Sequence, residues 1–384
     1  MTRIAILTGT RAEFGLLQPL IDLVLADPET ELQLLVTGMH LSPEFGMTVA
    51  EIKEHGYPVA DEIEILLSSD TAVGTAKSVG LATIGVADSL RRLQPNWLVL
   101  LGDRFELLGA ASAAMLMGVP IAHIHGGERT EGAVDEAIRH SLTKMASVHF
   151  VSAPEHRKRV IQLGEDPGRI QHVGAIGLDR IDRDELMQKS LLAKDLGIDA
   201  SLPWCVMTYH SVTLEPAHVK ADAEVLLNVI RSLPDVYFII TKANADEQGR
   251  LINRRLEEFV DTAPNAALFD SLGSHRYLSA VHAAEFVLGN SSSGIFEAPF
   301  LHTPTVDVGN RQRGRARGPS VVHAEMSEES ILRAVREART INDPDIFDRS
   351  PYYNGGAASP ILSVLKGPQP PRVKSFFDVQ FELL

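Results

Sequence analysis

The sequence predicts an α/β protein that contains two parallel sheets. Short apolar runs alternate with amphipathic stretches along almost the whole chain, which is the pattern of βαβ units. The runs are continuously apolar, as expected for strands that helices cover on both faces. A polar, helix-prone segment from Gly174 to about Leu202 interrupts the alternation, which then restarts. We therefore expect two Rossmann-like halves.

The spacing of apolar residues places strands and helices in the first half. Strands are expected at Ile4–Leu7, Leu32–Val36, Trp97–Leu101, Pro120–Ile124 and Val148–Val151. Helices are expected between them, at Leu16–Leu25, Ser78–Leu93, Glu106–Met117, Ala133–Met145 and Pro154–Leu163. Because a helix separates successive strands, these strands are expected to run parallel.

The second half repeats this pattern. Its expected strands are Trp204–Thr208, Val236–Thr241, Ala267–Asp270, Glu285–Leu288 and Thr305–Val308, and its expected helices lie near Ala217–Ser232, Glu247–Val260, Ser293–Leu301 and Glu328–Arg339. From Asp345 onward the chain is rich in Pro and Gly, with a short helix expected at Pro360–Leu365. Domains of about 150 residues are common, so we place a first domain at 1–175, a second at 176–365 and a tail at 366–384.

Composition narrows the functional classes. The 384 residues include 36 Lys and Arg against 50 Asp and Glu, a formal net charge of −14, which argues against general binding of nucleic acid or anionic membranes. The single Cys205 excludes an intramolecular disulfide and a zinc site of several cysteines. The first apolar run is too short for a signal peptide, and no run of about 18 uncharged apolar residues occurs. We expect a cytoplasmic protein without a membrane span.

Polar and titratable residues follow three of the apolar runs. They form the segments Gly102-Asp103-Arg104, His123 to Glu128, and Asp135 to His140. The carboxyl ends of parallel strands meet at the sheet edge where open α/β proteins bind ligands. Asp103 and Asp135 can supply general acid–base chemistry there. The alternative is that they form salt bridges with Arg104 and Arg139.

Histidines in these segments do not suggest a metal site. His123 and His125 alternate along an expected strand, so they face opposite sides and cannot together bind one metal ion in simple geometry. His210 follows the strand at Trp204–Thr208, where its imidazole can meet a phosphate. A lone histidine is otherwise usually structural.

Two turns have the composition of phosphate-binding sites. The first strand leads into Thr8-Gly9-Thr10-Arg11, where helix N-terminal amides and the Arg11 guanidinium can hold an anion; an ordinary turn explains the same residues. Asn290, Ser291, Ser292 and Ser293 lie between a strand and a helix, and Glu297 can accept hydrogen bonds from ribose hydroxyls. The alternative is a serine-capped helix with a solvated glutamate.

An arginine-rich segment follows in the same half. Asn310 to Gly318 contains four arginines, Arg311 first among them, in an acidic chain. The segment is either a second anion clamp or a solvated, mobile loop.

These motifs resemble those of the hydrolysing UDP-N-acetylglucosamine 2-epimerases of sialic-acid biosynthesis and their relatives in legionaminic-acid biosynthesis. The resemblance runs to about Leu365 and also includes Gly38-Met39-His40 and Gly309 to Gly314. It implies the GT-B architecture, with two Rossmann-like domains facing across a cleft, the sugar on the N-terminal side and the nucleotide chiefly on the C-terminal side. It also implies a homo-oligomer, dimer or tetramer, and chemistry that needs no cofactor.

The resemblance implies roles for individual residues. Asp103 and Asp135 are similar to catalytic carboxylates, and Glu297 is similar to the ribose anchor. The diphosphate ligands implied are Arg11, His210, Ser291 and Ser292. His40, Arg104, Asn290, Ser293 and Arg311 complete the expected substrate-binding set.

One position departs from many members of that family, which carry a catalytic glutamate where this chain has His125. A subset of relatives shares the histidine, and this chain has a glutamate three residues later, at Glu128. His125 and Glu128 therefore both join the catalytic candidates, and the division of acid and base roles stays open.

The implied reaction is loss of UDP from an N-acetylated sugar nucleotide to give a glycal, followed by addition of water that releases the inverted sugar. With UDP-N-acetylglucosamine the product is N-acetylmannosamine. UDP-2,4-diacetamido-2,4,6-trideoxyglucose and a GDP-linked analogue are close alternatives, because the motifs do not address C4 and C6 of the sugar. From other classes, a GT-B glycosyltransferase and a non-catalytic nucleotide-sugar sensor remain alternatives.

Overall fold

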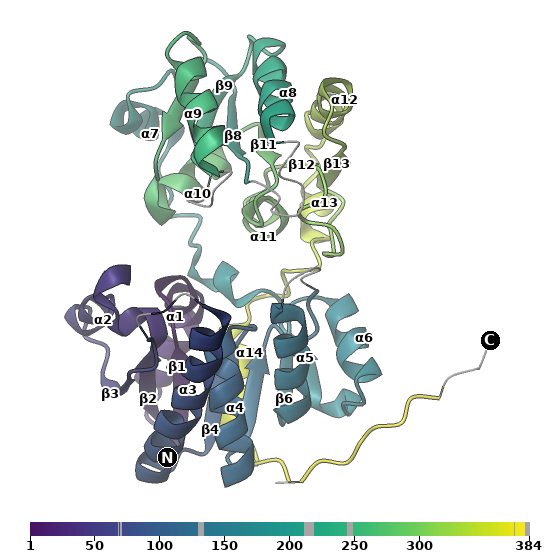
Figure 1. Ribbon diagram of the computed structural model, residues 1–384. Helices are drawn as coiled ribbons and strands as arrows, with labels where there is room; N and C mark the ends of the chain where they lie inside the picture. The colour runs from purple at the N-terminus through teal and green to yellow at the C-terminus, as the bar shows by residue number, and fades with distance from the viewer. Residues whose placement is uncertain are drawn as a thin grey trace. The chain divides into compact units, whose positions relative to one another are not determined.

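The computed structural model describes residues 1–67, 69, 71–129, 134–210, 219–243, 249–371 and 373–380. The chain divides into two compact units (Figure 1). Unit 1 contains Met1–Ile181 and Tyr352–Leu384, and unit 2 contains Asp182–Pro351. The division therefore differs from the predicted boundaries at residues 175 and 365, because the chain returns to unit 1 at Tyr352.

Unit 1 is built on a seven-stranded sheet with the order β3-β2-β1-β4-β5-β6-β7. All of its strand pairs are parallel. The strands are β1 (Thr2–Thr8), β2 (Thr30–Thr37), β3 (Val59–Ile63), β4 (Trp97–Leu101), β5 (Ile121–Ile124), β6 (Val148–Val151) and β7 (Ile170–His172). The five predicted strands are confirmed, and the sequence analysis missed the two edge strands, β3 and β7.

Helices cover both faces of this sheet, as Figure 1 shows. They are α1 (Arg11–Ala26), α2 (Val49–Glu54), α3 (Ala72–Leu93), α4 (Phe105–Met117), α5 (Asp135–Met145), α6 (Pro154–Gln162) and α14 (Ala358–Lys366), with short 3-10 helices at Gly38–Leu41, Pro43–Phe45, Pro167–Arg169 and Ile176–Arg180. The predicted start of α5 at Ala133 lies outside the described residues.

The C-terminal part of the chain completes the core of unit 1. Ile361 and Leu365 of α14 are fully buried among residues of β1, β4 and α1, and the Trp97 indole N–H donates to the Leu365 carbonyl at 2.9 Å. Beyond α14, the Lys374 ammonium donates to the Ala146 carbonyl at 2.7 Å and to Glu165 Oε2 at 2.6 Å. This last segment therefore stays attached to the end of α5.

Unit 2 contains a six-stranded parallel sheet with the order β10-β9-β8-β11-β12-β13. The strands are β8 (Trp204–Thr208), β9 (Tyr237–Thr241), β10 (Ala266–Phe269), β11 (Phe286–Gly289), β12 (Thr305–Val308) and β13 (Val321–Ala324). The helices are α7 (Lys189–Leu196), α8 (Val219–Arg231), α9 (Gly249–Val260), α10 (Gly273–Ala283), α11 (Ser293–Phe300), α12 (Glu328–Ala338) and α13 (Pro344–Asp348).

The predicted strands of unit 2 are confirmed to within a residue or so at each end, whereas β13 and α10 were not predicted. The predicted starts of α8 at Ala217 and of α9 at Glu247 lie outside the described residues. The predicted fold class, α/β with two Rossmann-like parallel sheets, is confirmed. In the described part of the chain, no helix combines the length and apolar character needed to span a bilayer.

Candidate active site

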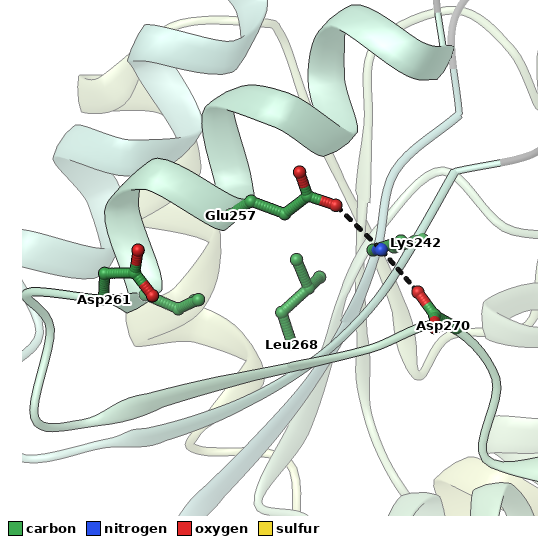
Figure 2. A pocket seen from close by; sticks show the side chains of 6 residues that line it. Lys242, Glu257, Asp261, Leu268 and Asp270 are labelled. Carbon is green, nitrogen blue, oxygen red and sulfur yellow. Dashed lines mark ion pairs between the residues drawn. The ribbon is translucent and has the colours of Figure 1, made fainter.

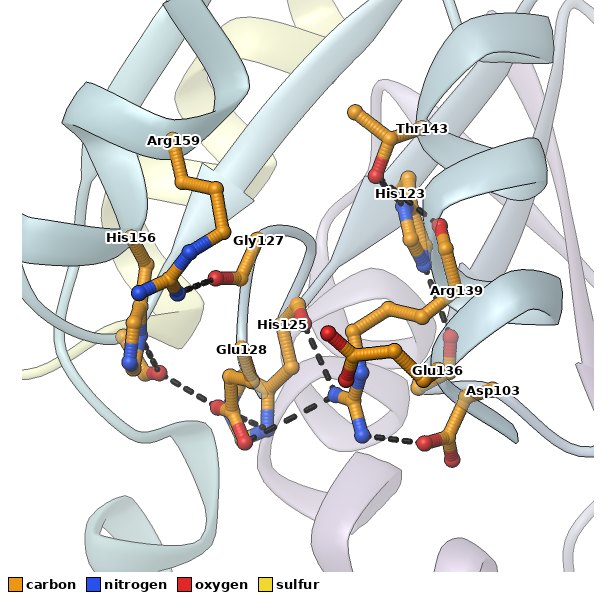
Figure 3. Close-up of polar contacts among 12 residues, drawn as sticks. Asp103, His123, His125, Gly127, Glu128, Glu136, Arg139, Thr143, His156 and Arg159 are labelled. Atoms are coloured by element: carbon orange, nitrogen blue, oxygen red, sulfur yellow. Dashed lines mark hydrogen bonds and ion pairs between the residues drawn. The ribbon is translucent and has the colours of Figure 1, made fainter. Parts of the chain in front are cut away.

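A group of buried and partly buried titratable side chains lies at the carboxyl ends of β4 and β5 (Figure 3). Asp103 follows β4, His125 and Glu128 follow β5, and Asp135 begins α5, which also carries Arg139. The structure thus brings together the four residues that the sequence analysis proposed as catalytic. Parallel strands make this possible because their carboxyl ends lie on one edge of the sheet.

Arg139 connects this group. Its Nη2 pairs with Asp103 Oδ2, its Nη1 donates to the His125 carbonyl at 3.1 Å, and the same atom lies 3.6 Å from Glu128 Oε2. Burial raises the pKa of Asp103, Arg139 lowers it, and the neighbouring carboxylates of Asp135 and Glu128 raise it again, with a net upward shift. The predicted alternative of a salt bridge with Arg139 is therefore real, and it lies inside the proposed site.

His125 is held in an unusual conformation. Its φ of 64° is in the left-handed region. Residues other than glycine rarely adopt this backbone conformation, and where they do it is often at a functional site. The ring lies between two partners: Nδ1 is 3.5 Å from Glu128 Oε1, and the Ile176 amide donates to Nε2 at 3.4 Å. These contacts favour the tautomer with hydrogen on Nδ1.

Glu128 is an anchored anion. Ser152 Oγ donates to Glu128 Oε1 at 2.5 Å, and the same hydroxyl lies 3.0 Å from His156 Nδ1. Burial acts to raise the pKa of Glu128, but His125, Arg139 and His156 together with the Ser152 hydrogen bond outweigh it and lower the pKa to about 2. Glu128 is thus ionised over the neutral range and is poorly suited to donate a proton. The sequence analysis missed Ser152 and His156.

His123 has a structural position. It is fully buried, with Nε2 2.8 Å from the Gly102 carbonyl and Nδ1 3.3 Å from Thr143 Oγ1 (Figure 3). Burial lowers its pKa to about 3, so the ring is neutral. Within the described ranges no three His, Cys, Asp or Glu side chains are grouped so as to hold a metal ion.

Two of the predicted substrate-binding residues lie in the segments that follow β1 and β2. Arg11 is the first residue of α1, and its side chain is 77% exposed, with Nε 3.4 Å from Glu51. His40 is fully buried, and its two nitrogens bond Thr8 at 3.1 Å and Thr48 at 2.7 Å. Arg11 is accessible to an anion. Both ring nitrogens of His40 contact hydroxyl groups of unit 1, and its role in substrate binding stays a prediction.

In unit 2, the turn after β11 is fixed to the end of β8. Asn290 Oδ1 accepts from the His210 amide at 2.7 Å, and Asn290 Nδ2 donates to the His210 carbonyl at 2.8 Å. Gly289 has a φ of 136°, and a Cβ there would overlap the Thr208 carbonyl. The Asn290 side chain therefore positions His210, while Ser291, Ser292 and Ser293 lead into α11.

The arginine-rich segment is tied to the same turn. Arg311 Nη1 and Gln312 Nε2 both donate to the Asn290 carbonyl, at 2.9 and 2.7 Å. Arg317 Nη2 lies 2.7 Å from buried Asp307, and Arg315 stacks over the ring of Phe296. Arg311, Arg315 and Arg317 therefore each have a partner within unit 2, and the choice between an anion clamp and a solvated loop stays open.

Tyr277 of α10 is a neighbour of this turn that the sequence analysis missed. Its hydroxyl lies beside Ser293 and Thr208, and burial together with Glu297 raises its pKa to about 12. No sequence motif includes Tyr277, and the helix that carries it, α10, was not predicted.

A separate pocket of unit 2 does not fit an anionic ligand (Figure 2). Lys242 Nζ is paired with Glu257 at 2.8 Å and with Asp270, and Asp261 and Leu268 lie nearby. The acidic groups outnumber the ammonium, and none of the predicted site residues lines this pocket.

The family model for UDP-N-acetylglucosamine 2-epimerase matches residues 24–366 of the chain. The chain belongs to this family. The predicted family and the predicted enzyme class are thereby confirmed.

Family members of known sequence cover nearly the whole chain. The GDP/UDP-N,N'-diacetylbacillosamine 2-epimerase (hydrolyzing) of Campylobacter jejuni is 40% identical and covers 85% of both chains. The UDP-N,N'-diacetylbacillosamine 2-epimerase (hydrolyzing) of Legionella pneumophila is 32% identical over 95% of both chains. The polysialic acid biosynthesis protein P7 of Escherichia coli is 31% identical over 95% of this chain and 94% of its own length.

Solved structures of the family share the fold. The UDP-GlcNAc 2-epimerase of Neisseria meningitidis bound to UDP-GlcNAc has a TM-score of 0.75 at 15% identity, covering 95% of this chain and 99% of the other. A UDP-N-acetylglucosamine 2-epimerase structure from Listeria monocytogenes gives the same TM-score at 17% identity, with 95% coverage of each.

Proposed function

We propose that the protein removes UDP from a UDP-linked 2-acetamido sugar and releases the free sugar inverted at C2. The observation that carries this proposal is the buried group at the ends of β4 and β5, in which Asp103, His125 and Glu128 are joined by Arg139. Acid–base side chains in a shared buried site suit a reaction that moves protons at carbon. Family membership supplies the substrate class.

In the first step the C1–O bond to the diphosphate breaks and the C2 proton is removed, leaving a C1–C2 double bond. That proton is barely acidic until positive charge develops at C1, so stabilisation of the departing diphosphate comes first. Arg11, His210, Ser291 and Ser292 are the groups proposed to hold it, together with amides at the start of α11. Glu297 is proposed to bind the ribose.

In the second step water adds across the double bond, its hydroxyl to C1 and a proton to C2 from the opposite face. We assign proton transfer to Asp103, Asp135 and His125, because the ionised, triply held Glu128 is a poor proton carrier. Glu128 instead orients the His125 ring. The upward pKa shift of Asp103 suits a group that must both accept and return a proton.

For the sugar, we favour UDP-2,4-diacetamido-2,4,6-trideoxyglucose. The support is that the relatives at 40% and 32% identity are named for N,N'-diacetylbacillosamine. UDP-N-acetylglucosamine, with N-acetylmannosamine as product, is the second candidate, supported by a 30% identical UDP-N-acetylglucosamine 2-epimerase of Neisseria meningitidis. A GDP-linked sugar is a third, since the Campylobacter relative's name includes GDP. Either sugar product fits a role in nonulosonic acid biosynthesis, of the legionaminic or sialic type.

The deciding experiment incubates the protein with each nucleotide sugar in heavy water, without an acceptor. We expect free sugar that is inverted at C2 and carries deuterium there, because the proton at C2 comes from solvent. Product that retains only hydrogen at C2 contradicts elimination and hydration. Turnover that requires an acceptor sugar instead identifies a glycosyltransferase.

We further propose that the protein is a cytoplasmic homo-oligomer that needs no cofactor. Support for self-association comes from exposed apolar side chains on the packed helices α3 and α4, namely Val73 and Ile84 at 64% and Leu116 at 80% exposure. Light scattering of the parent and of Ile84→Glu tests this: the parent should be a dimer or tetramer, and the variant smaller. A monomeric parent contradicts it.

A further inference from the structure

One buried carboxylate lies against three of the strand-end turns of unit 1. Glu106, in the first turn of α4, is fully buried. Its Oε1 accepts from Arg104 Nε at 2.5 Å, a Cβ on Gly9 would overlap it, and a Cβ on Gly38 would lie 3.5 Å from it. The turns after β1, β2 and β4 thus meet at Glu106, and a side chain at position 9 would displace the Glu106 carboxylate.

A second buried carboxyl group lies beside the first. Glu13, in the first turn of α1, is 5% exposed, and its Oε2 accepts from the Gly9 amide at 2.6 Å. Among the described residues, Glu13 Oε1 and Glu106 Oε2 are both buried without a hydrogen-bond partner. Two buried carboxylates beside a single guanidinium would leave one charge uncompensated, which is costly in a dry site.

We propose that Glu13 and Glu106 share one proton and act as positioning residues that fix the Gly9 turn and aim Arg104 at the anionic substrate. The part about substrate rests on the proposed function. The proton lies on Glu13 Oε1, since Oε2 accepts from Gly9, and Glu106 Oε2 is the acceptor left for it. Arg104, with its side chain 34% exposed, is thereby anchored through Nε. Its Nη2 lies 3.8 Å from Met39 Sδ, a weak acceptor that an anionic substrate can replace.

The charges around the pair agree with this assignment. Burial and the neighbouring Glu106 raise the pKa of Glu13, the Gly9 amide and Arg104 lower it, and the net result is a pKa of about 8. From the turn after β2, His40 adds no charge, because burial lowers its pKa to about 4. Above pH 8 the pair loses its shared proton, and repulsion between the two carboxyl groups should loosen the turn that each of them contacts.

The test compares Glu13→Gln and Glu13→Leu in the full chain, with exposed Glu54→Gln of α2 as a matched control. The amide of Gln keeps an acceptor for Gly9 and a donor for Glu106, so Glu13→Gln should retain turnover within about threefold at pH 7, whereas Glu13→Leu should raise KM at least about tenfold. The wild-type KM should rise above pH 8, and that rise should be absent in Glu13→Gln. Glu106→Gln, which weakens the hold on Arg104, should raise KM more than it lowers kcat.

A second readout does not depend on activity. The folded pKa of Glu13 lies above its ordinary value of 4.5. The contribution of Glu13 to the free energy of unfolding of unit 1 should therefore be complete below pH 4.5 and be lost as the pH rises to 8. Glu13→Gln should abolish this slope, and Glu54→Gln should keep it. An unchanged slope in Glu13→Gln, or equal damage by Gln and Leu at position 13, overturns the proposal. If the slope changes and no sugar is released by any variant, the proposed function fails instead.

Discussion

Replacing Arg139 by leucine should both destabilise unit 1 and impair turnover. The guanidinium is 7% exposed and contacts Asp103, Glu128 and the His125 carbonyl. Its loss leaves two acidic groups without their shared cation. Breaking a buried ion pair costs about 3–5 kcal/mol; Asp103 keeps 20% of its side chain exposed, so water compensates in part and about 3 kcal/mol is expected. Turnover should fall about 10²-fold or more, because Asp103 loses its orientation.

The chain contains two tryptophans, one in each unit, so unfolding of unit 1 can be measured separately from that of unit 2. Trp97 is buried in unit 1 and Trp204 in unit 2, so in a Trp204→Phe background the fluorescence of Trp97 follows urea unfolding of unit 1. Arg139→Leu should lower the urea midpoint with an unchanged slope. Arg91→Leu removes an exposed pair with Asp88 in the same unit and should leave the midpoint where it was.

Two outcomes refute this reasoning. If Arg139→Leu and the parent have the same urea midpoint, Arg139 does not stabilise the carboxylates that it contacts. A lowered midpoint with normal turnover at low urea would mean that the cluster supports the fold and lies outside the active site. UDP affinity should be unchanged, because the proposed nucleotide contacts are mainly in unit 2.

Three further predictions use the same assays. Asp103→Asn should lower turnover about 10²-fold or more and leave UDP affinity intact; equal loss of both would make Asp103 structural. His125→Gln should abolish most of the turnover, and His125→Glu should recover part of the rate, because a carboxylate can also transfer a proton; a near wild-type rate in His125→Gln would identify a packing residue. The folded pKa of Glu128 is about 2, against an ordinary value of 4.5. Glu128 therefore stabilises unit 1 above pH 4.5, and this stabilisation is lost as the pH falls toward 2. In Glu128→Gln the stability of unit 1, followed by Trp97 fluorescence, should fall less between pH 4.5 and 2; a fall as large as in the parent would contradict the lowered pKa.

Central strands were predictable and edge strands were not. A strand covered on both faces is mostly apolar, and the runs IAIL in β1, WLVLL in β4 and WCVM in β8 show this directly in the sequence. The edge strand β3 has the sequence VADEI, with two adjacent acidic residues, and β7 has three residues. Neither contains enough apolar residues to produce a pattern.

For the site, sequence order revealed which residues follow strands but not what each side chain contacts. Asp103, His125 and Glu128 were found because they directly follow β4 and β5. Sequence order also could not show that His40 contacts Thr8 and Thr48, because Thr8 lies 32 residues away along the chain. Ser152 and His156 act on Glu128 from 24 or more residues away, so no local motif could show them.

The return of the chain to unit 1 at Tyr352 has a consequence for biosynthesis. Unit 2 is continuous, from Asp182 to Pro351, so all of it emerges from the ribosome before α14 does. Unit 1 therefore keeps an exposed apolar face until Ile361 and Leu365 have been synthesised, because these side chains are fully buried in its core. The usual order, in which N-terminal domains fold first during synthesis, is therefore expected to be reversed, and chaperones should contact unit 1 throughout the translation of unit 2.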